Sequence, residues 1–206
     1  MIDKICTFLT NRIRKEMPEI DEQRAEIIYY GLQNIVGEIP KIFIMLAIAY
    51  LLGIFKWALF TFLALFPYKG ASGGVHLKTH LGCFICTNIV YCGNALISTI
   101  FNFPSEMYKY ITAIAIWIFG VIMVSIYAPA DTENLPILTK KERKIKKILS
   151  YIFLTINMIV AIFIKNNIIA NILIFGTIIQ TISITRIAYN ITKNKYGYET
   201  YLKEQM

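Results

Sequence analysis

Residues 69–83 bring together three side chains with the chemistry of a nucleophilic site. His76 and His80 are the two histidines of the chain, and Cys83 follows His80 by three residues. A cysteine reacts as its thiolate, and a neighbouring imidazole can take up the thiol proton. Covalent catalysis by a cysteine–histidine pair is therefore one chemistry that this stretch can support.

The separation of His76 and Cys83 decides whether the two can react together. On a continuous helix both lie on one face, because seven residues make nearly two full turns, but about 10 Å of rise separates them. Contact between imidazole and thiol therefore requires His76 to lie on an irregular turn that folds back. Gly70, Gly73 and Gly74 supply the backbone freedom for such a turn, whose amides could stabilise an oxyanion.

Three other interpretations of this stretch stay open on the residues alone. His76, His80 and Cys83 follow an i, i+4, i+7 pattern whose face could hold zinc, although no fourth ligand lies nearby in the sequence. His80 could be the base instead, since an i, i+3 spacing brings it closer to Cys83 on a regular helix. Finally, both histidines could lie in the lipid headgroup region without a chemical role.

The rest of the chain predicts a membrane protein around this stretch. Hydrophobic residues make up 56% of the 206, and the mean hydropathy is +0.55, which is more apolar than a soluble domain. Several uncharged runs approach the roughly 20 residues with which a helix crosses a bilayer. The runs are residues 42–55, 57–66, 81–101, 110–128, 148–164 and 168–185. We therefore expect an all-α fold, a polytopic bundle of membrane helices.

The basic residues predict six membrane segments with both ends of the chain in the cytoplasm. Of the 21 Lys and Arg, five then lie inside in the N-terminal region, two in loop 68–80, six in 140–147 and four in the last 21 residues. The exceptions are Lys56, Lys109 and Lys165, which lie outside, and Lys41, at the start of the first segment. The run 57–66 is short for a crossing, so it is either re-entrant or part of one tilted span over 42–66.

We expect one membrane domain over residues 1–206. Residues 1–36 are amphipathic, with apolar positions at near-helical spacing broken at Met17-Pro18, which predicts interfacial helices on the cytoplasmic leaflet. Residues 37–190 then form the transmembrane bundle, and residues 191–206 form a cytoplasmic tail. The net charge of +8 follows this topology, so we expect the lipid bilayer, and not nucleic acid, as a partner.

Two motifs resemble those of the accessory gene regulator B (AgrB) family of quorum-sensing peptide processors. The first comprises Lys69, Gly73-Gly74, one variable residue, His76, and a cysteine seven positions later. The second is the run Tyr-Ala-Pro-Ala-Asp-Thr-Glu-Asn-Leu-Pro from Tyr127, followed by basic residues. The chain has lysine at position 69 where the family usually has arginine, so a bidentate carboxylate contact is lost there.

The resemblance implies which residues act and on what substrate. It assigns His76 rather than His80 to the catalytic pair, with Cys83 as the nucleophile. The candidate substrate-binding residues are Lys69, Gly73 and Gly74. The implied enzyme cleaves the acidic tail from a short AgrD-like precursor peptide through a thioester and closes a thiolactone or lactone ring. It is expected to be a homodimer in the bacterial cytoplasmic membrane, with the catalytic loop facing the cytoplasm and without metal or cofactor.

A transporter, exporter or channel is the alternative from another class, and a non-catalytic membrane scaffold is a third. The middles of the four longest apolar segments carry no charged residue, whereas ion pathways usually contain one. Cys83 distinguishes these classes, because Cys83→Ser inactivates a processing enzyme, whereas a transporter or scaffold should tolerate it.

Overall fold

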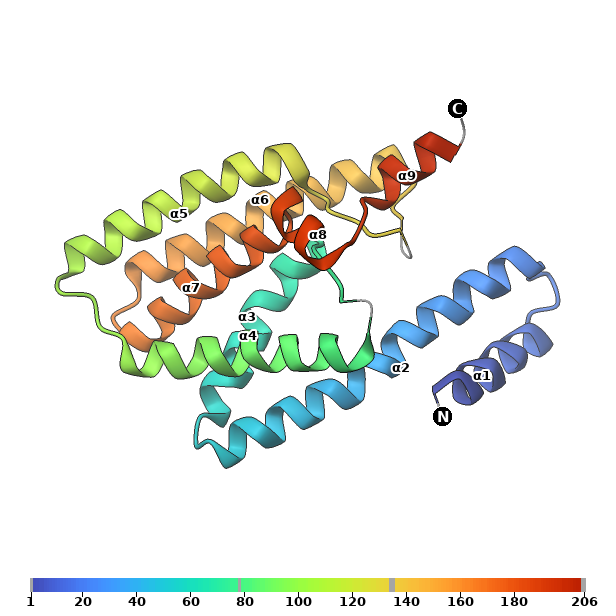
Figure 1. The fold of residues 1–206 in the computed structure, drawn as a ribbon, viewed down its shortest axis with the longest axis horizontal. Coiled ribbons are helices and arrows are strands. Elements are labelled where there is room, and N and C mark those ends of the chain that lie inside the picture. Colours follow the sequence, from blue (N-terminus) through green and yellow to red (C-terminus); the bar gives the residue numbers. More distant parts are fainter. Residues whose placement is uncertain (1, 78, 134–135, 205–206) are drawn as a thin grey trace. The chain divides into compact units, whose positions relative to one another are not determined.

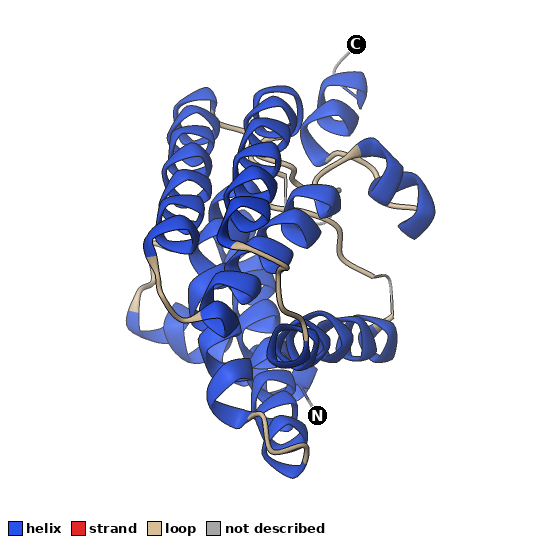
Figure 2. Ribbon diagram, turned by 90° about the vertical axis from the view of Figure 1, so that its left-hand side faces the viewer, coloured by secondary structure: helices blue, strands red, loops and turns tan. Residues whose placement is uncertain are grey.

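The structure is a computed structural model that describes residues 2–77, 79–133 and 136–204. In this part of the chain the regular elements are α-helices and no strand is present (Figure 2), which confirms the predicted all-α fold. The helices are α1 (Ile2–Glu16), α2 (Glu22–Leu51), α3 (Phe55–Ser72), α4 (His80–Ile100), α5 (Glu106–Tyr127), α6 (Lys140–Phe163), α7 (Asn167–Ser183), α8 (Arg186–Thr192) and α9 (Gly197–Glu204). The chain divides into two compact units, Met1–Ile48 and Ala49–Met206.

The first unit contains α1 and most of α2, with a proline in the turn between them. α1 ends at Glu16 because the ring of Pro18 disfavours helical backbone at the residue before it. The Asp21 carboxylate accepts a hydrogen bond from the Arg24 amide at 2.8 Å, which caps the start of α2. The amphipathic N-terminal pattern thus forms helices, as predicted, and α2 continues beyond it into the first apolar run.

A turn at residues 52–54 separates α2 from α3. Gly53 has a φ of 71°, a left-handed conformation that glycine adopts without steric penalty, and the Ile54 amide donates to the Ala49 carbonyl at 2.9 Å. α3 has 18 residues, about 27 Å of helix, so the short run 57–66 is the centre of a longer helix. The apolar run 42–66 is therefore two helices and not one continuous span.

Within the described residues, three helices are long and apolar enough to cross a membrane. They are α4 from Leu81 to Ile100, α5 and α6. A fourth span is added if α7 and α8, which are bent by 70°, form one broken segment. The chain is an all-α membrane protein with three to four candidate spans, and the six segments expected from the charge pattern stay a prediction.

α7 is the central helix of the second unit. It contacts α3, α4, α5, α6 and α8 (Figure 1), and nine of its 17 residues are buried. Buried amides connect it to α4: Asn171 donates to the Ser98 and Phe101 carbonyls at 3.2 and 2.7 Å, and Asn94 donates to the Ile172 carbonyl at 3.1 Å. Such interhelical hydrogen bonds help to hold membrane helices together, since lipid provides no hydrophobic driving force between them.

Gly176 lets α7 approach α3 and α4 closely. A Cβ atom at this position would overlap the Leu65 side chain and lie 2.8 Å from Asn94 Nδ2, closer than packed atoms can come. Gly93 of α4 differs, because no atom outside its own helix backbone lies within 4 Å of the corresponding Cβ position. Alanine substitutions at the two glycines therefore separate the effect of close packing from the effect of helix propensity.

We expect Gly176→Ala to lower the thermal unfolding midpoint of the detergent-solubilised protein. The added methyl group displaces Leu65 and Asn94, and overpacking of this kind costs about 1–3 kcal/mol. Gly93→Ala is the matched control, and it should leave the midpoint unchanged or raise it, because alanine is the better helix former. Equal midpoints for the two variants would contradict the close packing of α7.

Candidate active site

The site loop, residues 73–77, begins where α3 ends and follows a non-helical path. Gly73 has a φ of 76° and Gly74 a φ of 134°, values that L side chains rarely adopt. Gly73 forms an isolated parallel bridge with Ala130: the Ala130 amide donates to the Ser72 carbonyl at 2.8 Å, and the Gly74 amide donates to the Ala130 carbonyl at 2.9 Å. A Cβ atom on Gly73 would overlap the Ala130 carbonyl. Glycine is therefore required where the two backbones meet.

The C-terminal end of α7 holds the same loop from a second side. Gln180 is buried, and its carboxamide nitrogen donates to the Gly73 carbonyl at 2.7 Å and to Ser72 Oγ at 3.0 Å. The Val75 amide donates to the Ser183 carbonyl at 3.2 Å. Because a carbonyl can only accept, the first of these bonds fixes which end of the Gln180 carboxamide faces the glycine turn.

Thr79 caps α4 and thereby fixes the position of Cys83. Its Oγ1 accepts a hydrogen bond from the Gly82 amide at 3.1 Å, and its carbonyl accepts one from the Cys83 amide at 2.9 Å. Cys83 therefore lies in the first turn of the helix, where the aligned peptide dipoles favour negative charge. A helical side chain also points back toward the N-terminus of its helix, which directs this thiol toward the site loop.

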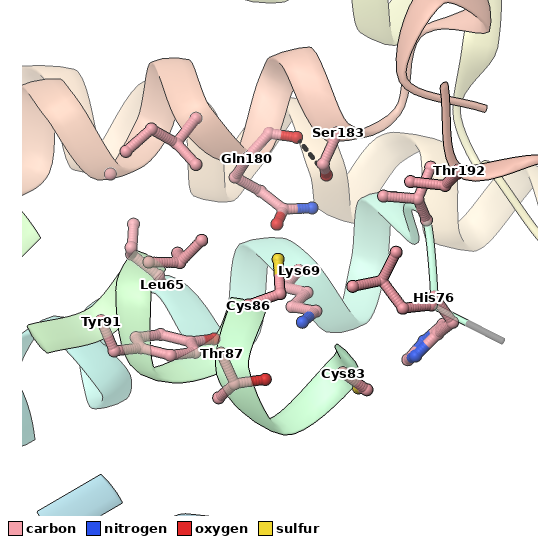
Figure 3. A pocket seen from close by; sticks show the side chains of 15 residues that line it. Leu65, Lys69, His76, Cys83, Cys86, Thr87, Tyr91, Gln180, Ser183 and Thr192 are labelled. Carbon is pink, nitrogen blue, oxygen red and sulfur yellow. Dashed lines mark hydrogen bonds between the residues drawn. The ribbon is translucent and has the colours of Figure 1, made fainter. Parts of the chain in front are cut away.

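One pocket contains both members of the predicted catalytic pair. Its empty volume is about 690 Å³, including the part open to solvent, and its walls come from α3, α4, α7, the site loop and Thr192. Figure 3 shows His76 and Cys83 near each other at one end of this pocket, with Cys86 and Gln180 further along it. The apolar part of the wall consists of Leu65, Val75, Leu77, Val90, Tyr91 and Ile179.

The structure places His76 before α4 and not on it. The zinc hypothesis assumed a continuous helix through His76, His80 and Cys83, and this assumption is wrong, because α4 begins at His80. The loop conformation at His76 instead supplies the irregular turn that contact with Cys83 requires. The side chain of His80 lies outside the described part of the structure, so an experiment must distinguish the two candidate bases.

Lys69, in the last turn of α3, contributes a positive charge to the pocket wall. Its side chain is half-buried, and within the described residues its ammonium group makes no hydrogen bond or ion pair. A cation that is partly removed from water and lacks a counter-charge attracts an anionic group. Lys69 therefore gives the pocket wall a positive charge that suits an anionic group.

The motif that begins at Tyr127 holds in place the backbone that pairs with the glycine turn. Asp131 is buried, and its Oδ2 accepts hydrogen bonds from the Ile137 amide at 2.8 Å, Arg143 Nη1 at 3.0 Å and the Tyr198 amide at 3.1 Å. These bonds fix the backbone next to Ala130, the residue that pairs with Gly73. The two family motifs, 54 residues apart between Gly73 and Tyr127, thus meet at one place.

Several site residues could not be identified from the sequence. Gln180 lies 108 positions from Ser72, and Asn194, which donates to the His76 carbonyl at 2.7 Å, lies 118 positions from it. Neither belongs to a recognisable motif. For Gln180 the sequence signal is a polar residue near the end of an apolar run, and a solvent-exposed helix end gives the same signal.

Comparison with known proteins identifies the family. The family model AgrB, Accessory gene regulator B, matches residues 6–184. A Listeria monocytogenes protein named AgrB-like is 28% identical over 193 residues, which cover 92% of this chain and 91% of that protein. Accessory gene regulator protein B of Staphylococcus aureus is 29% identical over 190 residues, covering 91% and 94%. A Clostridium perfringens protein named AgrB-like is 30% identical over 167 residues, covering 79% and 76%. No solved structure matches the chain.

The matched region contains the site loop, Cys83, the Tyr127 motif and the end of α7, and it covers most of the chain. The resemblance read from the two motifs is therefore confirmed. The chain belongs to the accessory gene regulator B family, and this membership implies that it takes part in the peptide processing of accessory gene regulator quorum sensing.

Proposed function

We propose that the chain is a cysteine endopeptidase and peptide cyclase that acts on a short AgrD-like precursor peptide. The observation that carries the proposal is the pocket in which His76 and Cys83 lie near each other at the start of α4. Family membership supplies the reaction class, which is peptide processing. The pocket supplies a thiol, a neighbouring imidazole and room for a segment of peptide.

The first half of the proposed reaction cleaves the precursor. His76 takes the proton from Cys83, and the thiolate attacks the carbonyl carbon of the peptide bond before the acidic tail. When the tetrahedral intermediate collapses, His76 returns the proton to the leaving nitrogen, and the tail departs with a free amino group. The rest of the precursor stays bound to Cys83 as a thioester.

The second half closes the ring and restores the enzyme. His76 takes the proton from a thiol or hydroxyl within the bound peptide as that group attacks the thioester carbonyl, and it then gives this proton to the departing Cys83 sulfur. Exchange of one thioester for another is nearly isoenergetic, so a thiolactone forms if water does not hydrolyse the intermediate first. The apolar wall of the pocket supports this outcome, because a peptide that packs against it would displace water from beside Cys83.

The charge distribution of the second unit supports a cytoplasmic location for the site. The helix ends that surround the site loop carry Lys69, the six basic residues of 140–147, and Arg186, whereas the opposite helix ends carry Lys56, Lys109 and Lys165. Loops rich in lysine and arginine stay in the cytoplasm. A precursor made in the cytoplasm would therefore reach the pocket without crossing the membrane.

The same basic residues suit a substrate with an acidic tail. Lys69 carries an uncompensated charge inside the pocket, and the basic start of α6 follows the Tyr127 motif that holds the glycine turn.

No metal or cofactor takes part in the proposed steps. A homodimer in the cytoplasmic membrane, which the resemblance implies, would carry two such pockets.

The nucleophile can be tested by co-expressing the chain with the short reading frame beside its gene, tagged on the acidic tail. We expect Cys83→Ser to reduce tail release by about 10³-fold or more, since the covalent step is lost. His76→Ala should reduce it by about 10²- to 10⁴-fold, the usual contribution of a general base. Gel analysis and mass spectrometry of the peptide measure both effects.

Cys92→Ala is the control for this experiment, because Cys92 is a buried cysteine of the same helix that does not line the pocket. It should release the tail at the wild-type rate. His80→Ala tests the competing base, and Cys86→Ala tests the second cysteine that lines the pocket. If Cys83→Ser still processes the peptide, the catalytic proposal fails and a transport or scaffold role becomes the better account.

We expect Lys69→Met to raise KM for the precursor by about tenfold with little change in kcat, because a hydrogen bond to a charged group contributes about 1.5 kcal/mol or more. Lys69→Arg keeps the charge and should retain most of the affinity. Lys56→Met, at the other end of α3, is the matched control. Steady-state rates in membrane vesicles measure both constants, and an unchanged KM in Lys69→Met would exclude the proposed contact.

Gly73→Ala should reduce processing by about 10²-fold or more, because the methyl group displaces the loop that carries His76, and a 1 Å misplacement is enough for such a loss. Gly70→Ala is the control from the same stretch, since a Cβ there meets nothing within 4 Å. Tail release at equal protein level is the measurement. Wild-type activity of Gly73→Ala would show that the bridge to Ala130 does not matter for the site.

A further inference from the structure

The C-terminal strap, residues 185–198, lies beyond residues 6–184 that the family model matches. Its residues 191–198 belong to the expected cytoplasmic tail, and it contains α8 and the first residues of α9. Thr192 lines the pocket, Asn194 bonds to the site loop, and the Tyr198 amide bonds to Asp131. The strap therefore forms part of the site in this chain.

The contact with the most direct chemical consequence joins Asn194 and His76. The carboxamide nitrogen of Asn194 donates to the His76 carbonyl at 2.7 Å. On either side of His76 the loop is also held by the Val75 amide bond to Ser183 and by the cap at Thr79. The Asn194 bond restrains the peptide unit that follows His76, one of the two that set the direction in which its imidazole projects.

Asn194 is itself held in place by the end of α8. Lys193 adopts a left-handed conformation, with a φ of 55°, and reverses the chain direction after the helix. The Asn194 amide then donates to the Tyr189 carbonyl at 2.9 Å, and its side chain bonds to Thr192 Oγ1 at 2.7 Å. The backbone and the side chain of Asn194 are therefore both held by bonds other than the one to His76.

Two tyrosines anchor the strap to the rest of the second unit. The Tyr189 hydroxyl donates to the Ala130 and Asp131 carbonyls, at 2.9 and 3.0 Å, and its ring stacks on that of Tyr196 with 4.0 Å between centroids. The Tyr196 hydroxyl donates to the Ile184 carbonyl at 2.8 Å. Burial raises the pKa of Tyr196 above its ordinary value, so this hydroxyl stays protonated and remains a donor.

We propose that Asn194 is a positioning residue, which sets the orientation of His76 toward Cys83 by donating a hydrogen bond to the His76 carbonyl. This inference rests on the proposed cysteine peptidase function. The donor is the essential part, because a carbonyl can only accept, and an aspartate at position 194 would have the same shape without the N–H group. The effect should fall on the chemical step and not on peptide binding, because Asn194 acts through His76.

The test compares Asn194→Asp and Asn194→Ala with wild type in full-length protein in membrane vesicles, using the tail-tagged precursor. We expect kcat to fall by about tenfold to 10²-fold with KM unchanged. Asn194→Gln keeps a carboxamide donor and should restore part of the activity. Asn190→Asp and Asn190→Ala are matched controls in the same strap, because this exposed side chain makes no hydrogen bond within the described residues.

Alkylation by iodoacetamide, followed site by site with mass spectrometry, gives a second readout that needs no precursor. Loss of the aligned imidazole should slow alkylation of Cys83 by about the same factor as kcat, because the thiolate is the reactive form. Cys92 is buried and reports general unfolding in the same sample. Its alkylation should stay slow in every variant.

The inference is overturned if Asn194→Asp shows wild-type kcat and wild-type Cys83 alkylation. It is also overturned if Cys92 becomes reactive in that variant, since Asn194 is then only structural. If the proposed function itself is wrong, the experiment gives a different result, because the Cys83→Ser variant would still release the tail. In that case the rate of Cys83 alkylation alone would decide whether Asn194 positions His76.

Discussion

The close approach of two backbones at Gly73 and Ala130 is the constraint on which the site depends. The carbonyl of Ala130 occupies the space that a Cβ on Gly73 would need, and the bonds of the bridge end α3 at Ser72. The chain leaves α3 in a conformation that only glycine adopts readily. The loop that follows therefore has a fixed starting direction, and His76 is three residues from that fixed point.

Supports from three other parts of the chain act on this junction or on the residues next to it. Gln180 binds the Gly73 carbonyl from α7, Asp131 orders the backbone next to Ala130, and Tyr189 bonds to the Ala130 carbonyl from the strap. Three parts of the sequence thus stabilise one loop conformation. A Cys–His pair needs such support, because its geometry must be set before the substrate binds.

The membrane explains why these supports are polar. Helices in lipid gain little from burying apolar surface against one another, so packing of small residues and interhelical hydrogen bonds hold them together. Gly176, in the middle of α7, and Asn171, in its first half, have these two roles. α7 can therefore serve both as the centre of the bundle and, at Gln180, as a wall of the pocket.

The sequence by itself determined the helical membrane class, the end of α1 before Pro18, the family, and the His76 and Cys83 hypothesis. These follow from local properties: apolar runs, a proline, and motif spacing in residues 69–83. It gave an apolar run of only residues 57–66 where the structure has the 18-residue helix α3, because the ends of α3 are helical although they are not apolar. Only the tertiary structure decided that His76 precedes α4, that Ala130 pairs with Gly73, and that Gln180 and Asn194 hold the loop. Those contacts join residues 57 to 118 positions apart, and no local pattern encodes which distant carbonyl a polar side chain will meet.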